Sequence, residues 1–490
     1  MPRSPGLRAV AVLVALFGHA ACGGSAPPRT TLRVLTQFPV ASLDPMLTGD
    51  TWTQALLANV YDPLVRLSAA GTLEPALATS WTNPDARTWR LELRPDVRFQ
   101  DGRAFGAGDV VWTVTHGLAA PDSWLRSVAP LLEGATEKGP LTVELRTREP
   151  AALLLHQVAA MLVMARAEGP RPPAGTGAYR VVRYRPDEVE LAAFTEHWRG
   201  RPRWAGAVFR CERDADARVQ AVRQGTADLV EVPPVAALDA LEGDRSVRLL
   251  VSRVPRLAAL GLSVAAGGPF ADAARRAAVA HGIDRVSLAT AFDGGRSLPA
   301  TQLAPPGIFG TPAEPGDPAG ALPPSVLPVV RVPLLYSGVR NGAIARALAL
   351  QSEATRVVFE PRELSAAEMD GHLAAGTVQA FVVHLTYPNL DASDFLTWGY
   401  HTRSADGRWG GGNFTGHSDA ATDAAIEASE REFDPRKRAA LLRGAMTAAV
   451  GAHVWVPLLV PPGYHLARPG LLWDASSSGR VRLEEIRAER

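Results

Sequence analysis

The sequence contains only two cysteines, no excess of charge of either sign and none of the short motifs that mark common catalytic sites. Cys22 and Cys211 are too few for a disulfide scaffold, and an exported chain of this length needs none. Lysine and arginine total 51 against 50 aspartate and glutamate residues, so no basic field favours a nucleic acid as partner. There is no G-x-S-x-G, H-E-x-x-H, C-x-x-C or G-x-x-x-x-G-K sequence. We therefore expect no enzyme, no catalytic residues, no metal or cofactor and no nucleic-acid partner.

The apolar run at the N terminus is too short to cross a membrane. It covers residues 9–17, against the ~20 residues that a membrane helix needs. Two arginines precede it, and small residues follow it up to Cys22, which is typical of an export signal. This end resembles a lipobox, although His19 stands where that motif has leucine. We expect residues 1–21 to be a signal peptide, Cys22 to be lipidated and residues 22–30 to form a tether; plain signal cleavage and a retained leader are the alternatives.

The remaining composition, 47% hydrophobic and 21% charged, is that of a globular chain with material for two or three cores. Residues 71–113 carry the clearest local pattern. Apolar and polar residues alternate over 89–94 and again over 97–100, which predicts two strands, each buried on one face, with turns after them. Gly106 then precedes a helical segment that has Asp109 in its first turn. The segment predicts strand, turn, strand, turn and helix.

The same segment resembles the family 5 extracytoplasmic solute-binding proteins, the peptide-, nickel- and oligosaccharide-binding receptors of bacterial ABC importers. The positions in step with that family are Gly71, Leu73, Pro75, Leu77-Ala78, Ser80-Trp81, Asp85, Leu93-Arg94, Val97, Phe99, Asp101-Gly102, Ala107 and Asp109-Val110. Gly106 departs from it, because the family has a threonine N-cap there; glycine costs a helix start only a few tenths of a kcal/mol. Further motifs extend the resemblance from about residue 32 to residue 465.

The resemblance implies an α/β fold of the two-lobed periplasmic-binding-protein type 2 class, with an extra subdomain in lobe I and a cleft that closes about a hinge. Alternating strand and helix patterns over 329–383 independently favour βαβ units and a parallel sheet. Residues 454–460 resemble the strand that returns to lobe I. The expected divisions are lobe I at 31–260 with the extra subdomain at about 46–168, lobe II at 261–455 with a proline-rich loop at 311–333, and a return to lobe I at 456–490.

The same resemblance implies a receptor that captures a peptide or another small polar solute and delivers it to an ABC permease complex. Two lobes that rotate about a hinge bury a ligand which contacts both of them. We expect an exported monomer, held at the cell envelope by its lipid anchor, in the periplasm or on the outer face of the cytoplasmic membrane. A receptor that docks to a membrane sensor is the alternative partner assignment.

We expect the ligand site between the end of the first strand and the loop-rich stretch 384–414. Aromatic walls with a few polar groups are typical of small-molecule clefts, and core packing is the alternative for each aromatic residue taken alone. The candidate ligand-binding residues are Thr36, Gln37, Phe38, His384, Tyr387, Asp391, Asp394, Trp398, Tyr400, Arg403 and Phe414, with Trp409 in the same stretch.

In peptide-binding relatives, an aspartate shortly before this motif pairs with the ammonium group of the peptide, and the resemblance places that position at Pro388. Proline offers neither charge nor an N–H donor. Asp391 or Asp394 would have to replace it, so sugars, metal chelates and other polar solutes stay open beside peptides.

Three histidines in this region do not have the spacing of a metal site. His384, His401 and His417 are 17 and 16 residues apart, which matches no compact ligand motif. We expect surface or cleft-lining histidines, while recognition of a nickel or haem chelate through one of them stays open. Arg403 would suit a ligand carboxylate, with a solvated loop arginine as the alternative.

Overall fold

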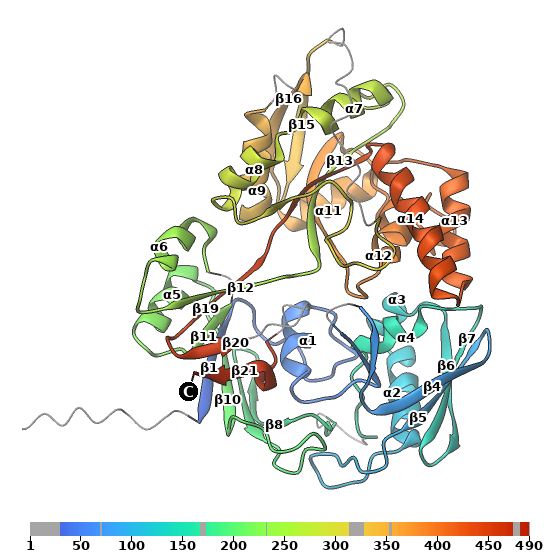
Figure 1. The fold of residues 1–490 in the computed structure, drawn as a ribbon, viewed down its shortest axis with the longest axis vertical. Coiled ribbons are helices and arrows are strands. Elements are labelled where there is room, and N and C mark those ends of the chain that lie inside the picture. Colours follow the sequence, from blue (N-terminus) through green and yellow to red (C-terminus); the bar gives the residue numbers. More distant parts are fainter. Residues whose placement is uncertain are drawn as a thin grey trace, which may run out of the picture.

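Two α/β lobes stacked along the long axis form the molecule (Figure 1). The computed structural model describes residues 30–68, 71–166, 173–231, 233–312, 328–351, 355–473 and 481–489. The predicted signal peptide, Cys22, nearly all of the tether and most of the proline-rich loop lie outside these residues. None of the described helices is long and apolar enough to cross a membrane.

A seven-stranded mixed sheet forms the centre of the first lobe. Its order is β12 (Arg248–Ser252), β19 (Gly463–Ala467), β11 (Leu229–Glu231), β1 (Thr31–Thr36), β10 (Gly206–Cys211), β9 (Glu188–Ala193) and β8 (Tyr179–Arg185). β1 runs parallel to β10 and β11, and the other pairs are antiparallel. Leu32 and Val34 of β1 are fully buried, as expected for a central strand. Further elements of this lobe are α1 (Thr51–Leu57), β2 (Val65–Leu67), β3 (Leu73–Pro75), α5 (Ala215–Arg223), α6 (Leu238–Glu242), β20 (Leu471–Trp473) and β21 (Ile486–Ala488).

A six-stranded sheet forms the centre of the second lobe. Its order is β14 (Leu298–Pro299), β18 (Trp455–Val460), β13 (Arg256–Leu262), β17 (Ala380–Thr386), β15 (Val330–Tyr336) and β16 (Val357–Glu363). β15 pairs in parallel with both β16 and β17, which confirms the βαβ units predicted there. The helices are α7 (Ala273–Gly282), α8 (Arg285–Asp293), α9 (Val339–Ala349), α11 (Ala366–Ala375), α12 (Ser393–Phe395), α13 (Ala420–Arg431) and α14 (Pro435–Gly451).

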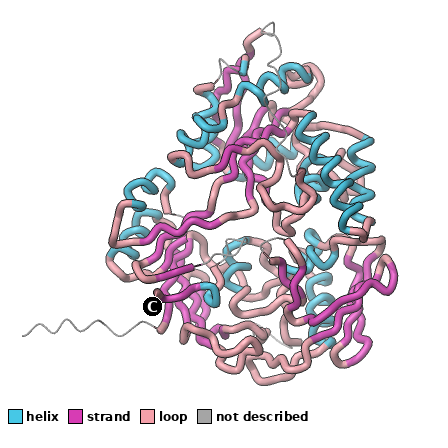
Figure 2. The backbone as a smooth tube through the Cα atoms, viewed as in Figure 1, coloured by secondary structure: helices cyan, strands magenta, loops and turns pink. Residues whose placement is uncertain are grey.

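A separate four-stranded antiparallel sheet lies beside the first lobe, and we call it the side sheet. Its order is β4 (Ala78–Asp85), β5 (Thr88–Leu93), β7 (Thr142–Thr147) and β6 (Leu132–Gly139), with α2 (Ala107–Ala119), α3 (Leu125–Val128) and α4 (Leu154–Gln157) in the same part of the chain (Figure 2). β5 and α2 confirm the first strand and the helix predicted from the sequence. Asp109 accepts a hydrogen bond from the backbone N–H of Gly106 over 3.0 Å, so the helix starts where expected.

The second strand predicted in this region is wrong. Residues 97–100 form no strand, and only an isolated bridge joins Arg98 to Ala104. Val97 and Phe99 are nevertheless fully buried. The segment is an extended loop that buries one of its two sides. An extended chain can bury alternate side chains in this way without hydrogen bonds to a neighbouring strand.

The chain passes between the lobes at two places that differ from the expected boundaries. β12 ends at Ser252 in the first sheet and β13 begins at Arg256 in the second, so the first passage precedes residue 260. The prediction that residues 454–460 return to lobe I is wrong, since β18 pairs with β13 and β14 in the second sheet. β19 makes the return. The residues of β18 are almost all buried. Their apolar composition is compatible with the interior of either sheet, so the sequence does not show which sheet contains the strand.

The two passages touch each other at Gly463. A Cβ atom at this position would lie 2.6 Å from Ser252 Oγ and 2.9 Å from Val254 Cγ1, so only glycine fits without displacement. Loop segments that connect two packed bodies at one point are the usual site of hinge rotation. This contact is therefore the candidate hinge.

Candidate ligand-binding site

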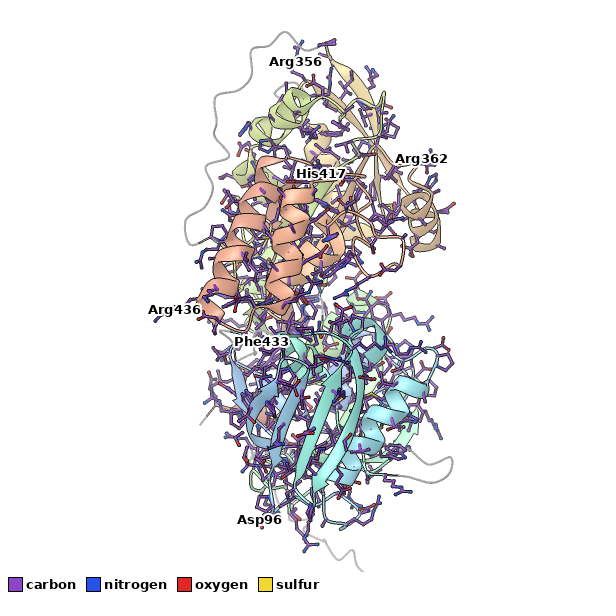
Figure 3. All side chains as sticks on the ribbon, turned by 90° about the vertical axis from the view of Figure 1, so that its right-hand side faces the viewer. Asp96, Arg356, Arg362, His417, Phe433 and Arg436 are labelled. Atoms are coloured by element: carbon purple, nitrogen blue, oxygen red, sulfur yellow. The ribbon has the colours of Figure 1, made fainter. Side chains whose placement is uncertain are left out.

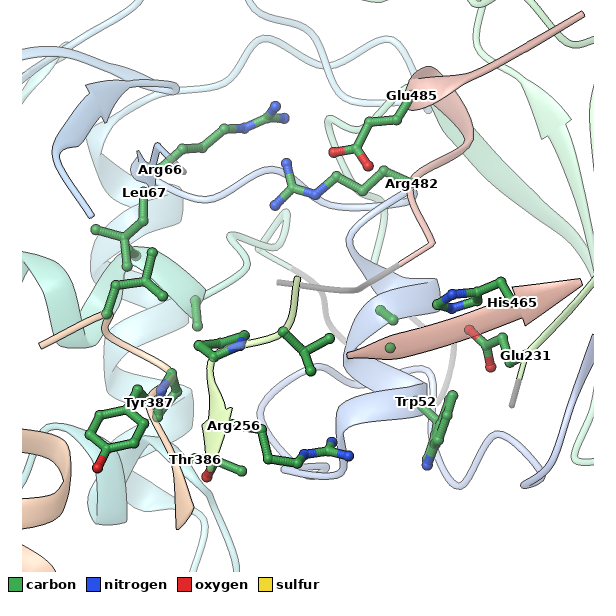
Figure 4. A pocket seen from close by; sticks show the side chains of 18 of the residues that line it. Trp52, Arg66, Leu67, Glu231, Arg256, Thr386, Tyr387, His465, Arg482 and Glu485 are labelled. Atoms are coloured by element: carbon green, nitrogen blue, oxygen red, sulfur yellow. The ribbon is translucent and has the colours of Figure 1, made fainter. Parts of the chain in front are cut away.

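A cavity of about 610 Å³ lies between the two lobes, and we call it the main cavity (Figure 4). Both lobes and both passages contribute to its wall. The side chains that matter below are Gln37, Trp52, Arg66, Glu231, Arg256, Arg340, Thr386, Tyr387, Pro388, His465, Arg482 and Glu484. Since the wall is divided between the lobes, any rotation at the hinge changes the shape of the cavity.

A second cavity of about 610 Å³ lies next to the first, and we call it the side cavity. Thr386 and Pro388 line both. One wall comes from α3, α4 and the loop between α3 and β6. The other comes from the stretch 384–411 and includes Trp398, which is 48% exposed. The two cavities form a cleft with a polar part and an aromatic part.

A buried acid closes the first-lobe end of the main cavity. Glu231 of β11 is 3% exposed and faces His465 across the ladder to β19. Burial raises the pKa of Glu231 to about 8, against a smaller opposing effect of Arg218. Burial, with the charge of Arg340, lowers the pKa of His465 to about 3. Both side chains are therefore largely neutral at pH 7, and Glu231 Oε2 and His465 Nδ1 have no hydrogen-bond partner among the described residues.

Two arginines enter the main cavity from the second lobe. Arg256 begins β13 and Arg340 is the second residue of α9. Burial lowers the pKa of both guanidinium groups, and the charge of Arg256 lowers that of Arg340 further. Burial and these two charges also lower the pKa of His384 to about 3. The three groups are thus electrostatic neighbours, and His384 adds no positive charge of its own near neutral pH.

The other arginines of the cavity are already paired. Arg66 forms ion pairs with Asp62 at 2.9 Å and with Glu484 at 3.1 Å. Arg482 lies 3.9 Å from the same Glu484 carboxylate. This network ties the C-terminal segment to β2, so we assign it to the scaffold of the first lobe.

The profile of the "Bacterial extracellular solute-binding proteins, family 5 Middle" matches residues 72–356, more than half of the chain. The chain belongs to this family. Its members are solute-binding receptors and not enzymes. The glutathione-binding protein GsiB of Escherichia coli O1:K1 is 27% identical over 317 residues, which cover 62% of this chain and 60% of that relative. The Salmonella paratyphi A protein of the same name is 24% identical over 447 residues, 86% of each chain.

Solved structures with the same fold extend over almost the whole chain. NikA from Brucella suis, in complex with Fe(III)-EDTA, has a TM-score of 0.80 at 20% identity and covers 94% of this chain and 100% of its own. DppA from Helicobacter pylori, in complex with the peptide STSA, has a TM-score of 0.74 at 18% identity and covers 94% and 98%. The two-lobed family 5 fold expected from the sequence is therefore confirmed.

Some of the predicted site residues of this family 5 protein line a cavity, and others do not. Gln37 and Tyr387 line the main cavity, and His384, Asp394 and Trp398 line the side cavity, as does Trp409. Thr36 and Phe38 line a small hollow next to Trp52. Asp391, Tyr400, Arg403 and Phe414 line none of the three.

Asp391 belongs to the framework of the second lobe. Its carboxylate receives two hydrogen bonds from Arg438, at 2.5 Å and 3.0 Å, and a third from the backbone N–H of Ser393. Both partners are almost completely buried. The oxygen atoms of Asp391 are occupied by this pair, which favours a structural role, and its contact with a ligand stays a prediction.

The other residues outside the cavities also have internal partners. The Tyr400 hydroxyl lies 2.9 Å from His417 Nε2, and Arg403 donates to backbone carbonyls of its own loop at Gly410 and Gly411. Phe414 packs against Phe381 and Trp398. Tyr387 does line the main cavity, but its hydroxyl donates to the backbone carbonyl of Leu303. Tyr400, Arg403 and Phe414 therefore have internal partners in this structure, and their contact with a ligand stays a prediction.

Asp394 and the histidines show no metal arrangement. Asp394 accepts hydrogen bonds from the backbone and side chain of Asn389, and burial beside Asp391 raises its pKa to about 8. His401 stacks on Trp409, and His417 bonds to Tyr400. No group of three or more potential ligands that could hold a metal ion occurs in the part of the chain that the structure describes.

The residues that the sequence interpretation missed are Glu231, Arg256 and Arg340. A carboxylate inside the apolar run 229–232 is a detectable anomaly, since unpaired acids are rarely buried. The two arginines carry no comparable signal, because each is one of many arginines in polar segments. Only the packing of three distant segments brings them to one cavity.

Proposed function

We propose that this protein is the substrate-binding component of an ABC importer, which captures a peptide or another small polar solute between its lobes and delivers it to the membrane permease. The observation that carries the proposal is a main cavity whose wall is shared by both lobes and both passages. A ligand bound there contacts both lobes only when they approach, so it stabilises the closed form. The permease then distinguishes loaded from empty receptors by shape.

The volume of the cleft supports a solute of a few residues or of equivalent size. Each cavity is within the range of small-molecule sites, and the two share Thr386 and Pro388 as lining residues. The relatives named above bind glutathione, the peptide STSA or a metal chelate. Pro388 stands at the junction of the cavities, where it supplies no charge for an ammonium group.

The proposed site of action is the cell envelope. An export signal that ends at Cys22, followed by a short tether, supports lipid anchoring outside the cytoplasm. We propose that the receptor works there as a monomer.

Native mass spectrometry of freshly purified protein tests capture directly. We expect a bound small molecule, together with a fall in the radius of gyration when that ligand is returned to emptied protein. Thr386→Trp, which fills the junction of the cavities, should emerge empty, while Thr447→Trp on the exposed face of α14 should retain the ligand. Equal occupancy in Thr386→Trp and wild type would place the ligand elsewhere.

A further inference from the structure

The buried acid at the first-lobe end of the main cavity has no partner that accounts for its burial. Glu231 is 3% exposed, and no ion pair or side-chain hydrogen bond joins its carboxyl group to any residue that the structure describes. By contrast, the buried carboxylates of Asp62, Asp228 and Asp391 each form an ion pair with an arginine. A buried acid without a partner costs free energy, and such groups are concentrated at functional sites.

The carboxyl group of Glu231 lies where a solute can reach it. Glu231 lines the main cavity and also the small hollow beside Phe38, and Trp52 of α1 lines the same two spaces. In the view of Figure 4, the Glu231 carboxylate lies between the imidazole ring of His465 and the indole ring of Trp52. The acid therefore forms part of the first-lobe wall of the cleft rather than of a closed core.

The groups around Glu231 favour a positively charged ligand group. His465 faces Glu231 across the ladder from β11 to β19 and is neutral near pH 7, so it does not balance a carboxylate. Arg218 of α5 acts on the carboxyl group only through its charge, and its guanidinium group donates to two backbone carbonyls. The indole of Trp52 adds an aromatic ring, and such rings attract cations.

The other acids of the main cavity do not offer the same site. Among the described lining residues, every acid comes from the first lobe or the C-terminal segment. Glu484 pairs with Arg66, Glu485 accepts a hydrogen bond from the indole N–H of Trp473, and Glu74 is exposed on β3. Within this lining, only Glu231 combines burial with a carboxyl group that has no partner.

We propose that Glu231 is the receptor for an ammonium group, so that the solute captured by this protein carries a primary amine. This inference rests on the proposed capture of a solute in the cleft. The ammonium group donates to the Glu231 carboxylate and lies against the indole of Trp52. The rest of the solute extends toward Thr386 of the second-lobe wall, and its contact with both lobes closes the receptor.

Binding of an ammonium group at this position displaces a proton. The carboxyl group of Glu231 is mostly protonated in the empty protein at pH 7, because burial raises its pKa to about 8. A carboxylate that accepts from an ammonium group is ionised, so the carboxyl proton passes to solvent while the solute keeps its own charge. A purely structural Glu231 would release no proton when a solute binds.

The test uses three amine probes, each with a counterpart that lacks the ammonium group, at constant ionic strength. The pairs are trialanine and N-acetyltrialanine, glutathione and N-acetylglutathione, and 1,5-diaminopentane and 1,5-pentanediol. Affinity and proton release are measured by titration calorimetry at pH 7 in buffers with different enthalpies of ionisation, and closure is measured by small-angle scattering. The proteins are wild type, Glu231→Gln, Glu231→Asp and the control Glu363→Gln, which changes an exposed acid of the second lobe.

We expect at least one amine probe to bind and close the wild type and the control, while its counterpart does neither. Glu231→Gln should lose at least about tenfold in affinity, since it loses a charge-assisted contact. Wild type should release about one proton per bound probe, and Glu231→Gln none. The amide of Glu231→Gln resembles the protonated acid, so the empty variant should melt close to wild type. Glu231→Asp, which keeps an acid, should bind with intermediate affinity and guards against a folding defect.

Three results would overturn the ammonium receptor: no binding of any amine probe, equal binding of a counterpart, or unchanged affinity and proton release in Glu231→Gln. Native mass spectrometry then separates this failure from a failure of capture. If the protein retains a solute that gains no mass on treatment with an amine-acetylating reagent, capture stands and only the ammonium receptor fails. If the protein is also empty, both proposals fail.

Discussion

Arg408 of the second lobe donates a hydrogen bond from Nη1 to Oε2 of Glu149, next to the side sheet, over 2.9 Å. Nearby, the backbone N–H of Ala152 donates to the carbonyl of Glu430, and the rings of Trp89 and Phe433 lie 5.9 Å apart. In Figure 3, Phe433 lies where the lobes meet. The lobes therefore touch at a second place besides the hinge, and these contacts do not involve a ligand.

We predict that Glu149→Gln opens the empty receptor. The pair is partly exposed, so its loss should cost about 0.2–1 kcal/mol and favour the open form by a factor of about 1.4 to 5. Small-angle scattering of empty protein should show a larger mean radius of gyration, and high salt should produce the same change in wild type. Glu133→Gln, whose partners lie within the side sheet, is the matched control and should change nothing. If wild type, Glu149→Gln and Glu133→Gln have the same radius of gyration, the contact between Arg408 and Glu149 does not affect closure.

Glu231 should make the empty protein less stable as the pH rises from about 5 to 8. Its pKa is about 8 when folded and about 4.3 when unfolded, so across this range only the folded state holds the proton. The free energy of unfolding then decreases with pH, by up to a few kcal/mol. Urea unfolding at pH 5 and pH 8 measures this change. The free energy of unfolding should decrease less in Glu231→Gln than in the exposed control Glu363→Gln. Asp394 and Glu430 have raised pKa values as well, so some dependence should persist.

Trp398→Ala should weaken ligand-induced closure. The indole lines the side cavity and is held by Phe414, whose ring lies 5.8 Å away, and by Gly412, which leaves no room for a larger residue. Loss of its contact area should reduce the affinity for the ligand about tenfold. Small-angle scattering and tryptophan fluorescence measure this change. Trp112→Ala, on α2 and outside both cavities, is the control. A binding curve equal to that of wild type would remove Trp398 from the site.

Asp391→Ala should destabilise the second lobe without a direct effect on ligand contacts. It leaves Arg438 buried without its main partner, which typically costs about 3–5 kcal/mol. Thermal unfolding should show this loss, and Asp370→Ala, exposed on α11, should be close to neutral. If affinity falls while the melting temperature does not change, Asp391 contacts the ligand after all.

Cys22→Ser should move the protein from the membrane fraction to the soluble exported fraction, because the acyl chains have no other attachment site there. Cys211→Ser is the control, since that thiol lies at the end of β10 and contacts the backbone of Gln37. Fractionation followed by immunoblotting measures both. A wild type that is already soluble would show that the lipobox interpretation is wrong.

The sequence by itself determined the family, the type of fold and the elements whose signals are local. β5 follows from alternation, and the start of α2 follows from Gly106 and Asp109. These features depend on residues a few positions apart, so the chemistry of the segment is sufficient to predict them.

Only the tertiary structure decided which sheet receives β18, where the chain passes between the lobes, and which residues line the cavity between them. Aromatic residues of the stretch 384–414 suggested a cleft, yet Tyr400 and Phe414 pack internally, whereas Glu231, Arg256 and Arg340 meet at the main cavity from separate segments. Their proximity follows from long-range strand pairing and from the hinge contact at Gly463. No local pattern encodes such contacts, because the free energy of a buried charge depends on neighbours that are distant in the chain.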